Sequence, residues 1–548
     1  MYSFFKKLKN CPSWCLVLLS GVLIGLNAPG YHTQLVGMVS LFPLFLVMDR
    51  AHTNCNYTLK QKFGYILIAC WGTGSVAALV GVPWLCYAAH TFGQFSRATA
   101  LLVTALCYGS EVAIVLFICF GIPTLFIQKR GFWDLLLRLS YFLAVEPFCP
   151  RLFHWSFGGM TFTQFPWLSQ VADVVGSPRL GLYNIGFSLL LLLIWRLKIE
   201  RLSVPVKVIR RLIVSYLILW AIGLTYGVWR IQFLENHVNK GTPLHIAAIQ
   251  PNFSHQQLRS DSMDFSVRLS NLRDLLKESA HALGKFPTDS PLPRLIIWPE
   301  STYPAAYLKD TALQPVVKHF TSLYQTSVLL HSIDWDEIPL GRRFYSIALL
   351  IGTDGEVKGH YNKIFRIPFG EYIPAADFFP SYANWLRKHI SHLFELEKGR
   401  EYTVFQLSDE LLFSAPICFD VFSPTIVRNM SRNGAKLAVN LSNLIWFGKT
   451  TASDHLEMTI RWKAIEHRIP VFLVSNNGKS VFINKLGANT SEQLGLFEKG
   501  SLSQTIFLKH HFSLYREYTW LVHTTFALLF MVAITLGHKK GHIFQKNW

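Results

Sequence analysis

The segment Leu295-Ile296-Ile297-Trp298-Pro299-Glu300 decides the fold of the central part of this chain. Four apolar residues in a row are typical of a strand in a sheet that helices cover on both faces. Pro299 lacks the backbone N–H that a further ladder bond needs, so the strand ends there. Glu300 therefore stands at the exit of a buried strand, where α/β sheets commonly carry functional side chains.

Apolar segments of the same kind recur on both sides of this strand. The expected strands are 244–250, 295–298, 327–333, 344–352, 356–362, 412–418, 437–441, 471–475 and 480–484. The expected helices are 262–283, 311–323, 422–432 and 452–467. Strands interleaved with helices in this way predict an α/β domain with covered sheets.

The rest of the chain is far more apolar. Of the 548 residues 51% are hydrophobic and only 16% are charged, whereas an ordinary soluble chain has roughly 25% charged residues. This composition disfavours a purely cytosolic enzyme, a disordered chain and a collagen-like chain. Eight transmembrane helices are predicted by the apolar stretches near 12–30, 35–49, 64–88, 99–127, 135–150, 180–196, 212–229 and 518–537. The second and fifth of these stretches are short or interrupted.

The predicted organisation has three parts. A seven-span membrane domain covers 1–230, the α/β domain covers 231–515, and a closing transmembrane helix with a basic tail covers 516–548. Lysine and arginine gather at the N-terminus, in the loops after the second, fourth and sixth spans, and in the tail. These residues are Lys6, Lys7, Lys9, Arg50, Lys60, Lys62, Lys129, Arg130, Arg196, Lys198, Arg201, Lys207, Arg210, Arg211, Lys539, Lys540 and Lys546.

That alternation sets the expected orientation. The intervening loops at 27–34 and 89–97 carry only Arg97. Positive residues on alternate loops predict cytoplasmic termini and an even number of spans, so seven spans place the α/β domain on the extracytoplasmic side. The net charge of +19 is thus divided among several loops. Nucleic acid is therefore not expected as a partner.

One thiol stands apart from the others. Eight of the nine cysteines lie in or beside the expected spans, and the α/β domain holds only Cys418. A lone thiol there has no partner for an internal disulfide, so it is either a small buried apolar residue or a nucleophile. Lys363 closes another expected strand, so three strand exits deliver a carboxylate, an ammonium and a thiol. A carboxylate can take the thiol proton and an ammonium can stabilise an oxyanion, although Glu300 and Lys363 could also form a plain ion pair.

These residues resemble those of a known family. Glu300, Lys363 in Tyr361-Asn362-Lys363, and Cys418 in Ile417-Cys418-Phe419-Asp420 are similar to the Glu-Lys-Cys triad of the nitrilase (carbon–nitrogen hydrolase) superfamily. Longer motifs narrow the resemblance to the apolipoprotein N-acyltransferases. They are PFGEYIP at 368–374, NLSN at 440–443 with WFG at 446–448, AIEHRIP at 464–470, SNNG at 475–478 and FPWL at 165–168.

The resemblance implies a fold and an activity. It implies a four-layer αββα sandwich on the periplasmic side of the bacterial inner membrane, as part of a multi-pass membrane protein. The enzyme would move an acyl chain from a phospholipid to the N-terminal amine of diacylglyceryl-cysteine in an apolipoprotein. The two-step mechanism would pass through a thioester, with the lipid bilayer as a partner and without a cofactor or a metal.

The resemblance also implies roles for single residues. Cys418 would be the nucleophile, Glu300 the general base and Lys363 the group that holds the oxyanion. Supporting or substrate-positioning roles fall to Glu371, Phe419, Asp420, Asn443 and Trp446. The family usually has Tyr-Glu where this chain has Phe419-Asp420, so a hydroxyl is absent and a carboxylate has a shorter reach.

The sequence leaves three points open. Segment 372–399 is either a mobile arm that touches lipid or a helix packed on the sandwich; its apolar residues are Phe378, Phe379, Tyr382, Trp385, Leu386, Leu393 and Phe394. Trp446 and Phe447 form either a lid or ordinary core. Two other functions compete with the transferase, namely a membrane-tethered amidase and a transporter or receptor, for which Glu111 within a span is the main support.

Overall fold

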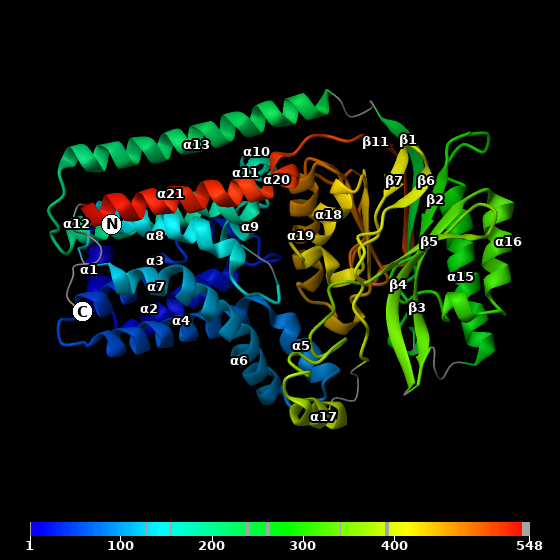
Figure 1. The fold of residues 1–548 in the computed structure, drawn as a ribbon, viewed down its shortest axis with the longest axis horizontal. Helices are drawn as coiled ribbons and strands as arrows, with labels where there is room; N and C mark the ends of the chain where they lie inside the picture. Colours follow the sequence, from blue (N-terminus) through cyan, green and yellow to red (C-terminus); the bar gives the residue numbers. More distant parts are fainter. Residues whose placement is uncertain are drawn as a thin grey trace. The chain divides into compact units, whose positions relative to one another are not determined.

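The computed structural model describes residues 2–127, 129–153, 156–236, 241–258, 264–339, 341–389, 394–490 and 492–539. Three residues named above, Leu393, Lys540 and Lys546, lie outside these ranges, as do the first two residues of the helix expected at 262–283. The chain divides into two compact units. The helical unit comprises Met1–Gln232 and Glu517–Trp548, and the α/β unit comprises Phe233–Arg516 (Figure 1).

Every stretch expected to span the membrane contains a helix. These helices are α2 (Ser13–Leu26), α3 (Phe42–Thr53), α4 (Leu59–Gly81), α6 (Arg97–Leu116), α8 (Phe132–Val145), α12 (Gly181–Lys198), α13 (Val206–Glu235) and α21 (Thr519–Lys539). Within the described residues, six helical segments are long and apolar enough to cross a membrane: Gln34–Thr53, Leu59–Gly81, Arg97–Phe126, Ser177–Lys198, Val206–Glu235 and Thr519–Lys539. Helices α2 and α8 have 14 residues each, or about 21 Å, against a hydrocarbon core of about 30 Å.

Small residues let three of these helices approach one another closely. A Cβ added to Gly21 of α2 would collide with Val76 of α4, and one added to Gly74 of α4 would collide with the carbonyl oxygen of Gly109 on α6. In a bilayer, such contacts replace the hydrophobic driving force that operates in water. The glycines therefore hold α2, α4 and α6 together.

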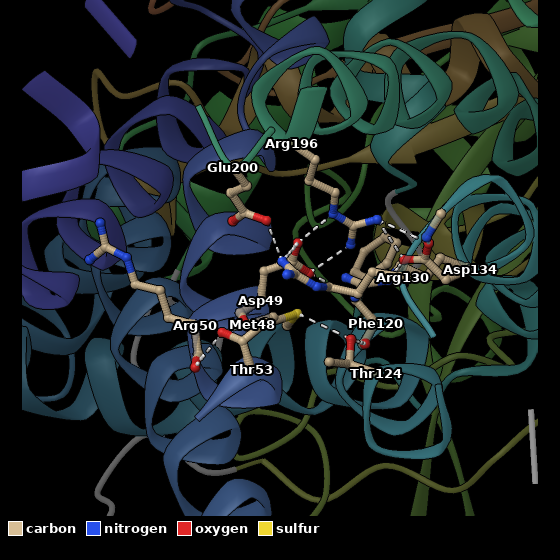
Figure 2. Close-up of polar contacts among 12 residues, drawn as sticks. Met48, Asp49, Arg50, Thr53, Phe120, Thr124, Arg130, Asp134, Arg196 and Glu200 are labelled. Atoms are coloured by element: carbon tan, nitrogen blue, oxygen red, sulfur yellow. Dashed lines mark hydrogen bonds and ion pairs between the residues drawn. The ribbon is translucent and has the colours of Figure 1, made fainter. Parts of the chain in front are cut away.

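An ionic cluster lies inside the helical unit, and Figure 2 shows Asp49 of α3 at its centre. Arg196 of α12 donates to Asp49 at 2.6 and 2.9 Å and to both oxygens of Asp134 of α8 at 2.9 Å. Arg138 of α8 donates to Asp49 at 3.0 Å. Arg196, which the sequence pattern groups with the loop charges, is thus buried in this cluster. Because a buried charge is costly without a partner, the cluster ties α3, α8 and α12 together.

The α/β unit is built on two larger sheets and a small ribbon. The first sheet has the order β11 (Gly500–Leu508), β1 (Thr242–Gln250), β2 (Arg294–Ile297), β3 (Ser327–Ile338), β4 (Gly341–Ile351) and β5 (Val357–Asn362). The second has the order β10 (Val481–Ile483), β9 (Val471–Ser475) and β8 (Ala438–Ser442). The ribbon pairs β6 (Phe405–Ser408) with β7 (Leu411–Phe413).

Helices cover the outer faces of both sheets. Helix α15 (Phe265–Leu283) contacts β1 and β11, and α16 (Gln314–Tyr324) lies beside it (Figure 1). Helix α19 (Ala452–His467) contacts β9 and β10 and packs against α18 (Ile426–Arg432). Strands β1 and β9 contact each other, so the sheets face each other between the helix layers. The α/β class expected from the sequence is therefore confirmed.

Several expected elements differ in detail. The strand expected at 412–418 is wrong beyond Phe413, because Ser414 and Ile417 form only single bridges to β8. Strands β6 and β11 were not expected from the sequence. The helix expected at 422–432 begins at Ile426, after the 3₁₀ turn Cys418–Phe422.

The segment 372–399 contains a helix, α17 (Pro380–His389). Its Ala383 and Leu386 are buried against Ile373 of the same segment, so the helix packs on its own preceding loop. Phe378 and Trp385 are instead 82% and 56% exposed. The segment is therefore a packed helix that still presents aromatic side chains to its surroundings.

Candidate active site

The expected triad meets at one edge of the α/β unit. Glu300 lies in the turn that follows β2, Lys363 directly follows β5, and Cys418 opens the 3₁₀ turn Cys418–Phe422. The bridge from Ile417 to Leu441 aligns the cysteine with the exit of β8, where Asn443 lies. All three side chains are almost fully buried. The structure therefore brings together the groups that the sequence places at three separate strand ends.

Lys363 lies between two carboxylates. Its Nζ is 2.6 Å from Oε1 of Glu371 and 3.6 Å from Oε1 of Glu300. Although burial disfavours the ammonium form, Glu371 and Glu300 together raise the pKa of Lys363 above its ordinary value. The second oxygen of Glu371 accepts the N–H of Ile367 at 2.8 Å, which fixes this carboxylate in its loop. Lys363 is therefore a permanent, oriented cation.

Glu300 faces both the cation and the thiol. Its Oε2 accepts the backbone N–H of Asn443 at 2.9 Å, and its carboxylate interacts electrostatically with the Cys418 thiol. Burial raises the pKa of Glu300, Lys363 opposes this rise, and Glu371 adds to it. A carboxylate with a raised pKa is a stronger base, and this one interacts with the thiol whose proton it would accept.

Cys418 combines backbone strain with a protonated thiol. Its φ of 47° lies in the left-handed region, which a residue with a side chain rarely adopts. Burial and the Glu300 carboxylate raise the pKa of Cys418 well above its usual value, against the opposing effect of Lys363. The side-chain amide of Asn440 donates to the Cys418 carbonyl at 3.0 Å and helps to hold the strained turn. At rest the proton therefore stays on sulfur.

Asp420 organises the loops around the triad. Its Oδ2 accepts the Tyr361 hydroxyl at 2.8 Å and the Ile417 N–H at 2.9 Å, and its Oδ1 accepts the N–H of Phe365 at 2.7 Å. Burial raises the pKa of Asp420 to about 6. The carboxylate therefore couples the turn that carries Cys418 to the strand end that carries Lys363.

The remaining expected residues surround this centre. Phe419 is buried, with its ring centroid 5.0 Å from Phe422 and 6.0 Å from Phe447. Trp446 is 37% exposed and meets His255 edge-on at 5.2 Å. Phe447 is therefore part of the core, whereas Trp446 lies at the surface. Among the described residues no group of three or more His, Cys, Asp or Glu side chains is placed to hold a metal ion.

Sequence reasoning did not single out His331, and it named Asn440 only as part of the motif NLSN at 440–443. Asn440 of β8 and His331 of β3 interrupt apolar runs, and both are buried with hydrogen-bond partners. A polar side chain inside a covered strand must find such a partner. That interruption is the signal that could have revealed them.

Two family models match separate parts of the chain. The model described as "Carbon-nitrogen hydrolase" matches residues 246–509, and the model described as "Apolipoprotein N-acyltransferase N-terminal domain" matches residues 20–194. The two matches fall in the α/β unit and in the helical unit, respectively. Each unit of the chain is therefore similar to one of these two family models.

Individual relatives show the same similarity. The chain is 25% identical over 520 residues to an apolipoprotein N-acyltransferase of Geobacter metallireducens, covering 92% of this chain and 91% of that protein. It is 26% identical over 535 residues to one of Pseudomonas syringae pv. tomato, covering 95% and 96%. A crystal structure of an amidase from Nesterenkonia sp. aligns at 18% identity with a TM-score of 0.37, covering 53% of this chain and 98% of that chain.

Proposed function

The chain belongs to the apolipoprotein N-acyltransferase family, and from this premise we propose how its site transfers an acyl group. The protein is a membrane acyltransferase. Its donor is a phospholipid, and its acceptor is the N-terminal amine of diacylglyceryl-cysteine in an apolipoprotein. The observation that carries the mechanism is that Cys418, Glu300 and Lys363 are buried together and interact electrostatically, with the Lys363 ammonium 3.6 Å from the Glu300 carboxylate.

The first step forms the acyl-enzyme. Glu300 accepts the thiol proton while the sulfur of Cys418 attacks the ester carbonyl carbon of the phospholipid. The carbonyl oxygen becomes an oxyanion, which the Lys363 ammonium stabilises in a site with little water. The C–O bond then breaks, the leaving alkoxide of the lysophospholipid takes the proton from Glu300, and a thioester remains on Cys418.

The second step transfers the chain to the acceptor. The α-amine attacks the thioester carbonyl, and Lys363 again faces the oxyanion. Glu300 takes a proton from the attacking nitrogen while the C–S bond breaks. Cys418 leaves as a thiolate and recovers the proton from Glu300, so the enzyme returns to its starting state with one amide bond made.

The bilayer setting follows from the substrate and the charges. We propose eight spans, which adds the short helices α2 and α8 to the six longer segments, with both termini in the cytoplasm and the α/β unit in the periplasm. The alternation of Lys and Arg along the loops supports this orientation. Moving a phospholipid into water would expose many methylenes, each at a cost of about 0.8 kcal/mol. The site should therefore open toward the bilayer surface, and the exposed aromatic residues of 378–385 would contact lipid near it.

The experiment is an acyl-transfer assay with full-length protein in detergent micelles. A palmitoyl-oleoyl phospholipid and a synthetic diacylglyceryl-cysteine peptide are supplied, and the acylated peptide is measured by mass spectrometry. Cys418→Ala abolishes the product in this account, whereas Cys55→Ser, an exposed cysteine of the helical unit, leaves it unchanged. Free fatty acid without acylated peptide would instead show that water is the acceptor, as in the hydrolase alternative.

A further inference from the structure

A buried histidine lies between the strands that carry Glu300 and Lys363. His331 belongs to β3, which pairs with β2 on one side and β4 on the other. Its side chain is buried, and its Nδ1 is 3.0 Å from the backbone nitrogen of Ser301. Its Nε2 is 2.9 Å from Oγ of Ser346 on β4. The mechanism above uses neither His331 nor Ser346.

These two contacts determine where the ring proton lies. A backbone N–H can only donate, so Nδ1 must offer a lone pair to Ser301 and the proton must sit on Nε2. Nε2–H then donates to the hydroxyl of Ser346. Burial, and after it the Lys363 ammonium, lower the pKa of His331 to about 3. The ring is therefore a neutral acceptor at Nδ1 throughout the neutral pH range.

The peptide that His331 holds is strained. Ser301 has a φ of 63°, in the left-handed region that is costly for a residue with a side chain. Its N–H belongs to the peptide that joins Glu300 to Ser301, so its orientation sets the direction from which the Glu300 side chain leaves the backbone. Such a conformation persists only where the surroundings fix it. The bond to His331 is the contact that satisfies this N–H.

The same ring reaches the strand pair that carries the ammonium. The backbone carbonyl of Ser346 accepts the N–H of Lys363 at 2.9 Å. A continuous path of hydrogen bonds therefore runs from the peptide after Glu300, through His331 and Ser346, to the backbone of Lys363. The two nitrogens of the ring face opposite ends of this path.

We propose that His331 is a positioning residue for Glu300, which it holds by accepting the N–H of Ser301 at Nδ1. This inference rests on the proposed function, because it takes Glu300 as the base that removes the Cys418 proton. The two ring nitrogens then differ in importance. The bond at Nδ1 sets the orientation of Glu300, and the bond at Nε2 only holds the imidazole ring in place.

Two substitutions separate the two nitrogens. His331→Asn places an amide oxygen close to the position of Nδ1, and His331→Gln extends its amide toward the position of Nε2. We expect His331→Asn to acylate Cys418 with palmitoyl-oleoyl phosphatidylethanolamine within about threefold of the wild-type rate, since the bond to Ser301 is kept. In His331→Gln the rate of Cys418 acylation should be lower by about 10²-fold, because a displacement of Glu300 by about 1 Å takes it out of reach of the thiol proton.

The readouts distinguish positioning from stability. Acylation is followed by intact-mass spectrometry, and thermal unfolding of each variant is measured in the same micelles. Ser346→Ala, which removes only the Nε2 partner, should behave like His331→Asn. Equal loss of rate in the Asn and Gln variants, or an unfolded protein in either case, would assign His331 to stability and overturn the inference.

A failure of the proposed function would look different. In that case the wild-type protein itself forms no adduct with the phospholipid at Cys418. Alkylation of Cys418 by iodoacetamide needs no phospholipid and still depends on removal of the thiol proton. The inference requires the same ranking of the variants in that reaction, and a ranking with Gln equal to or above Asn contradicts it.

Discussion

Replacing Lys363 by methionine removes the cation from the site and leaves an unbranched apolar side chain that is one atom shorter. The Lys363 Nζ lies 3.6 Å from Oε1 of Glu300. At this distance and an effective dielectric constant of about 20, the attraction is about 5 kcal/mol as an upper bound. Since one pH unit corresponds to about 1.4 kcal/mol, removing the cation should displace the titration of the site upward by about two to three pH units.

The sign follows from the charges. Lys363 favours the ionised forms of both Glu300 and Cys418. Without it, the shared proton leaves the pair only at higher pH, and the two groups titrate together rather than separately. Cys418 should therefore react more slowly at neutral pH and regain reactivity as the pH rises.

The assay is alkylation of Cys418 by iodoacetamide over a range of pH, resolved by peptide mass spectrometry. Lys358→Met is the matched control, because Lys358 is exposed and pairs with Asp354 away from the triad. Its pH profile should coincide with that of the wild-type protein. An unshifted profile in Lys363→Met, with or without a uniform loss of rate, would refute the electrostatic coupling.

Three further predictions concern stability and membrane contact. Asp420→Asn removes two accepted hydrogen bonds at Oδ2 and should lower the free energy of unfolding by about 2–4 kcal/mol at low pH, whereas the exposed Asp377→Asn should have no effect in denaturant titrations. The folded pKa of Asp420 is raised to about 6. Its protonated form therefore contributes stability that is present below about pH 4 and lost as the pH rises through 6. If the difference in unfolding free energy between the wild-type protein and Asp420→Asn does not fall over this pH range, the assignment is contradicted. Asp49→Asn should cost about 3–5 kcal/mol by leaving buried arginines unpaired, seen as a lower unfolding temperature in micelles, and an unchanged temperature would remove the cluster as a stabilising element. Substituting both Phe378 and Trp385 by serine should slow acylation from phospholipid vesicles but leave iodoacetamide alkylation of Cys418 unchanged, and an equal effect on both reactions would exclude a lipid contact.

The strand exits at Glu300 and Cys418 could be read from the sequence because each joins an apolar run to a polar residue. Glu300 follows such a run and a proline, and Cys418 is the single cysteine of its domain. The covered sheets make these runs nearly continuous in apolar residues, which is a strong signal. Glu300 and Lys363 follow β2 and β5 of the first sheet, whereas Cys418 adjoins β8 of the second. The strand pattern therefore places each group at a strand exit, and the family resemblance implies that the three groups meet.

Other features depend on contacts that local patterns do not encode. Strand β11 carries small polar residues and pairs only with β1 at the sheet edge, so it lacks an apolar run. Two of the bonds of Asp420 reach Tyr361 and Phe365, more than fifty residues away, and no pattern in the sequence near Asp420 indicates them. Arg196 reads as a loop charge at the end of a span, and only the positions of Asp49 and Asp134 on other helices show that it is buried.

The most direct test of the account is the intact mass of the protein after incubation with a phospholipid of defined acyl chains. The account predicts an increase equal to one acyl group, which peptide mapping places on Cys418 and which a diacylglyceryl-cysteine peptide removes as an amide. The increase should be absent in Cys418→Ser. An acyl group on another residue, or transfer to the peptide that persists without the Cys418 thiol, would contradict it.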